Sequence, residues 1–254
     1  MKVLVVIPAR YASTRFPGKP LALLGGETIV SRVWHRVKAV ESVNDVYVAT
    51  DDSRIFDHVV GFGGEEAAMM TSSTHHSGTD RCGEVLQKLE ARGRHYDVVI
   101  NVQGDEPFID PGQVETLAKS FEDPAVQIAT LVTHFSSTED LLSPNNAKVV
   151  VSEQGKALYF SRQPIPYRRG VPVERWLDEG KYYKHVGIYA FRSEVLHKVC
   201  ALKPAPLEES EKLEQLRWLS AGYQISVYET DHTNIGIDTP EDLAEAEMKL
   251  KGEK

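Results

Sequence analysis

Short runs of β-branched and other apolar residues recur along the chain and predict strands. These runs cover Val3–Ile7, Val46–Thr50, Asp97–Val102, Ile128–Thr133, Lys148–Ser152, His185–Phe191 and Ile225–Glu229. The first and third are the most apolar, which is typical of strands that helices cover on both faces. Amphipathic segments between the runs predict helices over Thr28–Ala39, Gly83–Ala91 and Gln113–Phe121.

The alternation of strand and helix patterns predicts βαβ units, and therefore an α/β fold with a mainly parallel sheet. One stretch, from about Pro144 to Trp176, is richer in Pro, Arg and Tyr and reads as an excursion from that sheet. Ligands of such folds bind beyond the carboxyl ends of the strands. The loops that follow the predicted strands are therefore where functional residues are expected.

Composition narrows the class of protein. The 254 residues are 41% hydrophobic and 26% charged, as in soluble globular proteins. No apolar stretch approaches the ~20 residues of a membrane span, and the net charge of −8 argues against a nucleic-acid partner. Cys82 and Cys200 lack a CxxC-like spacing, so reduced structural thiols and a cytoplasmic location are expected.

The loop after the first strand is basic. Arg10, Arg15 and Lys19 follow Pro8 and Ala9 within a few residues. Clustered cations repel one another unless an anion joins them, and Arg forks with a Lys point charge suit a triphosphate. The loop is neither a Walker A nor a GxGxxG motif. A solvated basic loop is the alternative.

Two aspartates end other strand-like segments. Asp105 follows the third strand after Gly104, and Asp238 precedes a helix that is expected to start near Pro240. Mg²⁺ on nucleotides takes one or two carboxylates, with phosphate oxygens and water as the other ligands. Asp105 could instead serve a turn, and Asp238 could cap the helix in competition with Thr239. From spacing alone, the two readings are equally supported.

A further loop, Thr74–Arg81, leads into a predicted helix. Ser77, Gly78 and Arg81 offer small polar groups and a donor that could contact a base or ribose edge or could brace the Gln103 loop. Two adjacent histidines cannot easily face one metal ion. His75 and His76 are therefore expected to be surface polar residues.

The second half of the chain holds another polar set. Its members are Arg162, His185, Tyr189, Glu214 and Gln215. His185 and Tyr189 stand four apart and hence on one face of a strand, while Glu214 and Gln215 lie beside an apolar stripe in a helix predicted over residues 207–219. Together they suit a polyhydroxy acid. Separately, each has an ordinary reading as a core or surface residue.

Eight motifs, in order along nearly the whole chain, resemble those of the 3-deoxy-manno-octulosonate cytidylyltransferases, the CMP-Kdo synthetases. They are PARYASTRFPGKPL, ATDD, SGTDR, NVQGDEP, YFSRQPIPY, KHVGIYAF, LEESEKLEQLR and GIDTPEDL. The resemblance implies a Rossmann-like nucleotide-diphospho-sugar transferase fold with a mixed, mainly parallel sheet. It implies one domain over residues 1–254, with a smaller sugar-binding and dimerisation subdomain inserted at about 144–200.

The resemblance also implies an activity: CTP and 3-deoxy-D-manno-octulosonate (Kdo) as substrates, Mg²⁺ as cofactor, CMP-Kdo for lipopolysaccharide synthesis as product, and a homodimer. It matches Arg10, Arg15 and Lys19 to the triphosphate loop, Asp105 and Asp238 to the metal ligands, and Ser77–Arg81 to the nucleotide side. It adds Gln103 to the sugar-binding set of Arg162, His185, Tyr189, Glu214 and Gln215. Arg10, Lys19, Asp105 and Asp238 are the implied catalytic residues.

Two small departures from the family pattern leave the sugar and cytosine contacts less defined. Phe191 stands where Tyr is common, and the segment before SGTDR lacks the usual Pro. A sialic acid or an amino-substituted Kdo is therefore the nearest alternative acceptor. A non-catalytic nucleotide-binding module would be expected to have lost an acid or the basic loop, and both are present.

Overall fold

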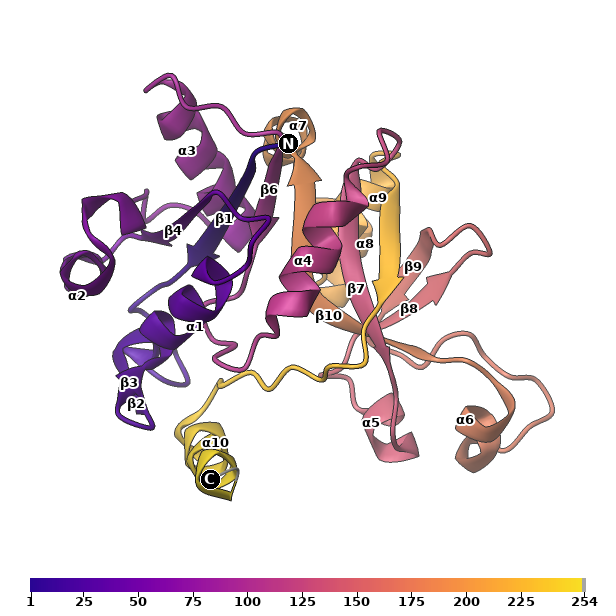
Figure 1. The fold of residues 1–254 in the computed structure, drawn as a ribbon. Coiled ribbons are helices and arrows are strands. Elements are labelled where there is room, and N and C mark those ends of the chain that lie inside the picture. The colour runs from indigo at the N-terminus through magenta and orange to yellow at the C-terminus, as the bar shows by residue number, and fades with distance from the viewer. Residues whose placement is uncertain (253–254) are drawn as a thin grey trace. The chain divides into compact units, whose positions relative to one another are not determined.

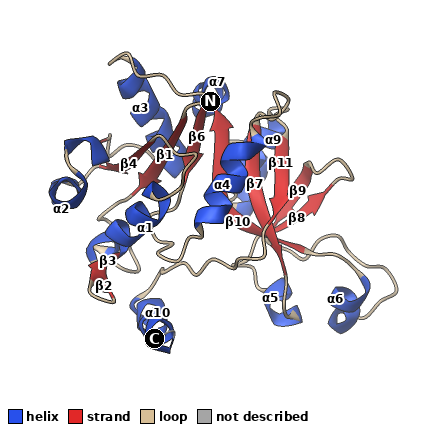
Figure 2. Cartoon of the chain, viewed as in Figure 1, coloured by secondary structure: helices blue, strands red, loops and turns tan. Residues whose placement is uncertain are grey.

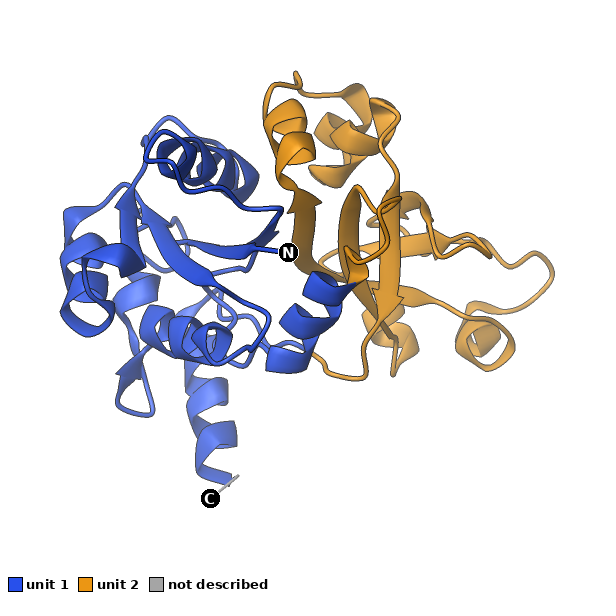
Figure 3. Cartoon of the chain, turned by 45° about the horizontal axis from the view of Figure 1, so that its top comes forward, with its two compact units in different colours: residues 1–119, 234–254 blue, residues 120–233 orange. Residues whose placement is uncertain are grey.

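The computed structural model describes residues 1–252. The chain forms two compact units, coloured separately in Figure 3. Unit 1 comprises residues 1–119 and the segment that begins at Asn234, and unit 2 comprises residues 120–233. The chain therefore leaves unit 1, builds unit 2 and returns to complete unit 1.

Unit 1 is built on four parallel strands, in the order β6-β1-β4-β5. They are β1 (Val3–Pro8), β4 (Asp45–Thr50), β5 (Ala68–Met70) and β6 (Val98–Asn101). Val5 pairs with Val46 on one side and with Ile100 on the other. Residues Val3–Ile7 of β1 are buried, as the continuous apolar pattern predicts for a strand covered on both faces.

Helices connect these strands in two directions (Figure 1). The connections through α1 (Ile29–Lys38) and α2 (Ser53–Gly63) lead from β1 to β4 and on to β5, and α3 (Gly78–Glu90) leads back to β6. Because such crossovers are right-handed, α1 and α2 cover one face of the sheet and α3 the other. From β1 the sheet is extended on one side by β4 and β5 and on the other side by β6. In α/β folds a ligand crevice forms at such a point.

The remaining elements of unit 1 are short, apart from two helices. A hairpin of β2 (Leu23–Leu24) and β3 (Glu27–Thr28) follows the 3-10 turn η1 (Lys19–Leu21), and η2 (Glu65–Ala67) precedes β5. After β6 comes α4 (Pro111–Ser120), which ends at the border of the units. The returning chain ends unit 1 with α10 (Pro240–Gly252).

Unit 2 has a mixed sheet, whose strands are red in Figure 2. In it β7 (Ile128–His134) runs parallel to β11 (Ile225–Glu229) and antiparallel to β10 (Tyr183–Arg192). A second antiparallel pair, β8 (Lys148–Val151) with β9 (Ala157–Ser161), joins through β8 to β10. The helical segments are α5 (Thr138–Leu142), η3 (Val173–Arg175), α6 (Trp176–Glu179), α7 (Ser193–Cys200), α8 (Pro206–Glu211) and α9 (Gln215–Ser220).

The predicted α/β class and all seven predicted strands are confirmed. The prediction of one helix over residues 207–219 is wrong, because α8 ends at Glu211 and α9 begins at Gln215. The break lies at Lys212, which has φ +53° in the left-handed region. The pattern also left α2, β5 and β9 unpredicted; β5 has only three residues, too few to show a period.

Unit 2 is wider than the insertion expected at residues 144–200, since it begins at Ser120 and ends at Thr233. The difference arises because β7 and β11, on either side of that stretch, pair with each other. Within residues 1–252, no helix has both the length and the apolar character required to cross a membrane.

A candidate active site at the carboxyl ends of β1 and β6

A pocket of about 450 Å³ opens in unit 1 at the carboxyl ends of β1 and β6. The loops after these two strands, the start of α3 and the returning segment before α10 form its walls. It collects ten residues that the sequence predicted for nucleotide, metal or sugar binding: Pro8, Ala9, Arg10, Arg15, Lys19, Gly78, Arg81, Gln103, Asp105 and Asp238. Ser77, also predicted, caps α3 instead of lining the pocket.

Two glycines let these walls approach one another. A Cβ atom added at Gly104 would lie 2.6 Å from the backbone oxygen of Pro8, closer than real Cβ contacts allow. A Cβ atom at Gly78 would lie 3.1 Å from the Pro8 ring and 3.2 Å from the Asn101 amide. The close approach of the β6 loop to the end of β1 therefore requires glycine at position 104.

Asp105 and Asp238 converge on one cation. The Lys19 Nζ atom lies 2.7 Å from a carboxylate oxygen of Asp105 and 3.0 Å from one of Asp238. The Lys19 side chain is only 13% exposed, so its charge is held at the base of the pocket. The two carboxylates that the sequence placed on separate loops thus face the same point in space.

The returning chain is fixed to the β6 loop by its backbone, since the Ile237 N–H donates to the Asp105 carbonyl oxygen at 2.9 Å. The helix-cap alternative for Asp238 fails because Thr239 fills that role: its Oγ1 accepts from the Asp242 N–H at 3.2 Å. In return, the Asp242 carboxylate accepts from the backbone N–H groups of Asp238 and Thr239. The Asp238 carboxylate therefore remains available to the pocket.

The other cations of the basic loop differ in their contacts. The Arg15 Nη2 atom lies 3.0 Å from the second carboxylate oxygen of Asp238, with both side chains largely exposed. Arg10 is exposed and lines the pocket, and it has no hydrogen bond or ion pair with other residues in the range 1–252. An anionic ligand in the pocket could therefore be met by Arg10 without breaking an existing contact.

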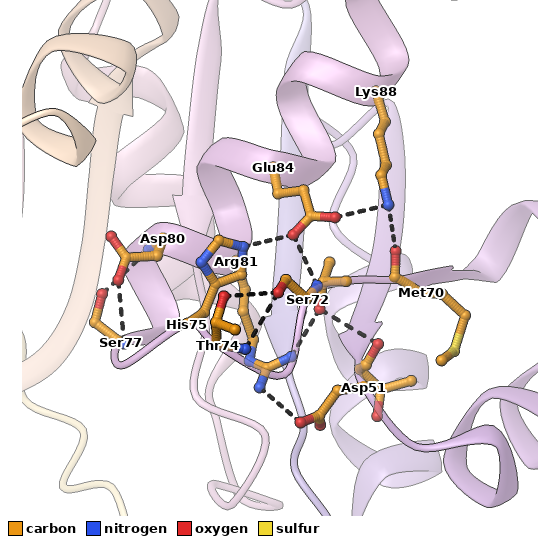
Figure 4. Close-up of polar contacts among 12 residues, drawn as sticks. Asp51, Met70, Ser72, Thr74, His75, Ser77, Asp80, Arg81, Glu84 and Lys88 are labelled. Carbon is orange, nitrogen blue, oxygen red and sulfur yellow. Dashed lines mark hydrogen bonds and ion pairs between the residues drawn. The ribbon is translucent and has the colours of Figure 1, made fainter.

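Arg81 is the buried cation of the pocket (Figure 4). Its side chain is 2% exposed; it donates to Thr71 Oγ1 at 2.7 Å and lies 3.2 Å from the Asp51 carboxylate. Asp51, within the ATDD motif, follows the end of β4. Arg81 thus joins the loops after β4 and β5 to α3, a role that the sequence analysis did not predict. The position of Asp51 beyond a predicted strand was the available signal.

The loop before α3 is anchored by Glu84 (Figure 4). Its carboxylate accepts from the Ser72 N–H at 2.8 Å, contacts His75 Nε2, and pairs with Lys88 at 2.7 Å. Burial opposes ionisation, but these hydrogen bonds from Lys88, Ser72 and His75 lower the pKa of Glu84 to about 2. His75 is therefore a partly buried anchor of the loop, whereas His76 is exposed as predicted.

Beside the aspartate pair, Glu106 has a different environment. Burial and the charge of Asp105 raise its pKa to about 7, against the effect of a hydrogen bond from the Asn234 amide. Asn234 is the first residue of the returning segment. The Glu106 side chain therefore links that segment to the β6 loop next to the pocket.

In unit 2, His185 and Tyr189 lie on one face of β10, as predicted, with ring centroids 5.2 Å apart. The strand bulges between them, and Thr130 Oγ1 fills the bulge by bonding His185 Nε2 at 3.0 Å and the Ile188 carbonyl at 2.8 Å. Burial lowers the pKa of His185 to about 3. His185 is therefore a neutral ring near pH 7.

The hydroxyl of Tyr189 is buried and has no hydrogen-bond partner within residues 1–252. Its ring packs edge-on against Trp218, whose buried Nε1 is likewise unpartnered there. Burial and the nearby charge of Glu214 raise the pKa of Tyr189. Orphaned buried donors are costly and rare in native structures, so this pair indicates a place where a polar ligand would be received.

Most of the hydrogen-bond donors of Arg162 are already bonded within unit 2. Its guanidinium donates to three backbone carbonyls: Glu211 at 2.7 Å, Pro144 at 2.9 Å and Lys212 at 3.2 Å. Three of the five N–H groups of an arginine are therefore committed. Gln215 is buried at the start of α9, and Glu214 directly precedes it. The break between α8 and α9 therefore sets the positions of both residues.

Known proteins are similar to this chain over nearly its whole length. A family model described as cytidylyltransferase matches residues 4–227. The 3-deoxy-manno-octulosonate cytidylyltransferase of Bacteroides thetaiotaomicron is 52% identical over 254 residues, covering 99% of both chains. The chain belongs to the 3-deoxy-manno-octulosonate cytidylyltransferase family. The protein of that name from Parabacteroides distasonis is 51% identical over 250 residues, covering 97% of each chain.

Solved structures confirm the fold of this family member. A CMP:2-keto-3-deoxy-manno-octonic acid synthetase complexed with CTP matches with a TM-score of 0.91 and 42% identity, covering 100% of both chains. A 4-diphosphocytidyl-2C-methyl-D-erythritol synthase from Anaerococcus prevotii matches with a TM-score of 0.63 at 14% identity, covering 98% of this chain and 96% of that one. The second likeness concerns the fold alone.

Substitution of Gly104 by Ala should displace one wall of the pocket. The new Cβ atom would meet the Pro8 carbonyl at 2.6 Å, so the β6 loop must move and carry Asp105 with it. We expect nucleotidyl transfer to fall by about 100-fold, the loss that a displacement near 1 Å can cause. The control is Gly61→Ala in α2, where a Cβ atom would meet nothing within 4 Å. Equal activities of the two variants would contradict the packing argument.

The buried neutral His185 should make the free energy of unfolding pH-dependent. Its pKa is about 3 in the folded protein and about 6.5 in the unfolded chain. The unfolded chain therefore binds a proton first, and stability is lost as the pH falls below about 6.5. We expect up to about 1.4 kcal/mol lost per pH unit relative to His185→Gln. Urea denaturation between pH 7 and pH 5 measures this, with His76→Gln retaining the wild-type slope.

Proposed function

We propose that the chain joins CTP and 3-deoxy-D-manno-octulosonate into CMP-Kdo and pyrophosphate, for lipopolysaccharide synthesis. The observation that carries the proposal is the convergence of Asp105 and Asp238 on Lys19, at the base of a pocket rimmed by Arg10 and Arg15. The relatives named for this reaction share about half of their residues with the chain, end to end.

In this proposal the pocket of unit 1 holds the nucleotide. Arg10 and Arg15 neutralise the triphosphate, and Gly78 leaves room at the start of α3. Arg81 contributes a fixed positive charge from within the wall. When the C2 hydroxyl oxygen of the sugar attacks the α-phosphorus, the bond to the bridging oxygen breaks and pyrophosphate leaves, while the hydroxyl proton passes to solvent. Charge develops on the leaving group, and the basic loop stabilises it.

Asp105 and Asp238 fit a magnesium ion. Their carboxylates face a single point, now bridged by Lys19 Nζ, and both ligands are hard oxygen donors. Within residues 1–252, no group of three or more His, Cys, Asp or Glu side chains could hold a metal. Phosphate oxygens and water would thus complete the shell. The bound ion would supply Lewis-acid polarisation of the phosphate, while Lys19 would turn from the carboxylates toward the phosphates.

The polar set of unit 2 is proposed to receive the sugar. The unpartnered Tyr189 hydroxyl and the neutral His185 offer hydrogen bonds to hydroxyl groups, and Arg162 retains two N–H groups for a carboxylate. Gln103, which lines the pocket of unit 1, is proposed as a sugar-binding residue from the family resemblance. A homodimer and a cytoplasmic location are proposed from the family resemblance.

Another acidic sugar, such as a sialic acid or an amino-substituted Kdo, is the second candidate acceptor. Tyr189 and His185 would hydrogen-bond the hydroxyls of either class, so these side chains favour an acidic polyol without selecting one. A non-catalytic nucleotide-binding module would be expected to lack one of the two aspartates, and both face the pocket.

Pyrophosphate release with each ribonucleotide triphosphate and each acidic sugar tests the proposed reaction. We expect turnover with CTP and Kdo in Mg²⁺, and at least about 100-fold lower kcat/KM with UTP, ATP or GTP. The same protein should lose activity in EDTA and regain it on addition of excess Mg²⁺. Turnover with a sialic acid but not with Kdo would show that the proposed acceptor is wrong. Turnover with UTP alone would show that the proposed base is wrong.

Asp105→Asn should remove nearly all turnover, because the amide cannot supply the charge of a metal ligand. We expect kcat to fall by about 1,000-fold, with the thermal unfolding midpoint within a few degrees of wild type. The matched control is Asp97→Asn, just before the other end of β6, whose carboxylate accepts from the Lys2 N–H. An Asp105→Asn enzyme with wild-type turnover in Mg²⁺ would refute the metal assignment.

A further inference from the structure

Unit 2, whose polar set is proposed to receive the sugar, also holds a buried lysine. Lys148, in β8, has no exposed surface, and no carboxylate within residues 1–252 pairs with it. Its Nζ atom instead donates to the backbone oxygens of Ser143 at 2.6 Å and of Arg162 at 2.7 Å. A buried ammonium without a counter-charge is costly, so its retention calls for an account beyond packing.

One of the two carbonyls that Lys148 binds is that of Arg162, and the Arg162 guanidinium in turn binds the neighbouring loop. Arg162 donates to Pro144 O, next to the Ser143 carbonyl that Lys148 also binds. Lys148 and Arg162 therefore hold the Ser143–Pro144 segment together from two sides. Removal of the Lys148 ammonium would free the carbonyl oxygens of Ser143 and Arg162, and the segment would then be held only by the Arg162 guanidinium.

The other donors of Arg162 reach the end of α8. A helix leaves its last carbonyls without partners, and Arg162 takes two of them, those of Glu211 and Lys212. Lys212 sits at φ +53°, a conformation that a lysine keeps only when its surroundings hold it. The Arg162 side chain thus supports the bend after which Glu214 and Gln215 start α9.

The local charge favours an anion. Lys148 and Arg162 contribute two positive charges, and Glu211 contributes one negative charge, bound to Ser161 Oγ at 2.7 Å and to the Arg162 N–H at 2.8 Å. Burial, and next the charge of Arg162, lower the pKa of Lys148, and Lys184 adds to the repulsion while Glu211 opposes it. Among these groups, the positive charges of Lys148, Arg162 and Lys184 outnumber the single negative charge of Glu211.

We infer that Lys148 is a positioning residue for a carboxylate-bearing sugar. It fixes the main chain of Arg162, and through Arg162 the bend at Lys212, so that the free N–H groups of Arg162 and the start of α9 are prepared for an acidic ligand. The buried ammonium cannot touch the ligand and acts only through these neighbours. The inference rests on the proposed function for the identity of the ligand.

The test compares Lys148→Met with Lys156→Met by steady-state kinetics in CTP, Kdo and Mg²⁺. Lys156 lies in the same β8–β9 hairpin, and its Nζ donates to Ser226 Oγ at 2.7 Å, away from Arg162. We expect Lys148→Met to raise KM for the sugar by about 10- to 100-fold, with KM for CTP within about twofold of wild type. Lys156→Met should match wild type in both constants. Equal rises in both KM values, or none, would overturn the inference.

Hydrogen exchange in the free enzyme gives a readout that needs no substrate. The Arg162 N–H bonds Glu211, and the Lys212 and Arg217 N–H groups bond the carbonyls of Glu208 and Glu214. In Lys148→Met these amides should exchange faster, while those of β7 and β11 keep wild-type rates. Unchanged exchange would refute the positioning role, whatever the acceptor. Absence of Kdo turnover in the wild type would refute only the proposed substrate, because the exchange result stands independently.

Discussion

Two carboxylates and one ammonium group, drawn from three distant parts of the chain, meet at the base of the pocket in unit 1. Two carboxylates that approach the same point repel each other, and a cation between them offsets that repulsion. Lys19 supplies that cation in the free protein. The glycine at position 104, the backbone bond from Ile237 and the cap of α10 by Thr239 all serve to bring these charges together.

The polar groups of unit 2 follow a different principle. Arg162 and Lys148 donate hydrogen bonds to backbone carbonyls and thereby hold the loops around them in place. The Tyr189 hydroxyl and Trp218 Nε1, by contrast, are buried without partners among residues 1–252. Satisfied groups hold a shape, and orphaned groups can accept a ligand at little cost. Both kinds occur here in one unit.

Much of this arrangement could be predicted from the sequence, because buried parallel strands have a strong apolar signature and their ends are candidate sites. The pocket residues from Pro8 to Lys19 and Asp105 were found in this way. The role of Asp238 could not be decided, since the choice between it and Thr239 as cap depends on side-chain geometry.

Other features left no local signature. The break at Lys212 lacks the glycine that usually announces a left-handed residue. Asp51 and Arg81 are 30 positions apart, and only the fold brings them together. Lys148 reads as part of an ordinary strand, because burial without a carboxylate partner cannot be seen in a sequence.

The return of the chain to unit 1 at Asn234 has a consequence for biosynthesis. A protein emerges from the ribosome from its N-terminus, so Lys19 and Asp105 are made before any residue of unit 2. Asp238 follows only after all of unit 2 has been translated. A nascent chain can thus assemble most of this pocket while its second carboxylate is still missing. Chemical competence would then come late and abruptly during translation, and incomplete polypeptides would not consume nucleotide.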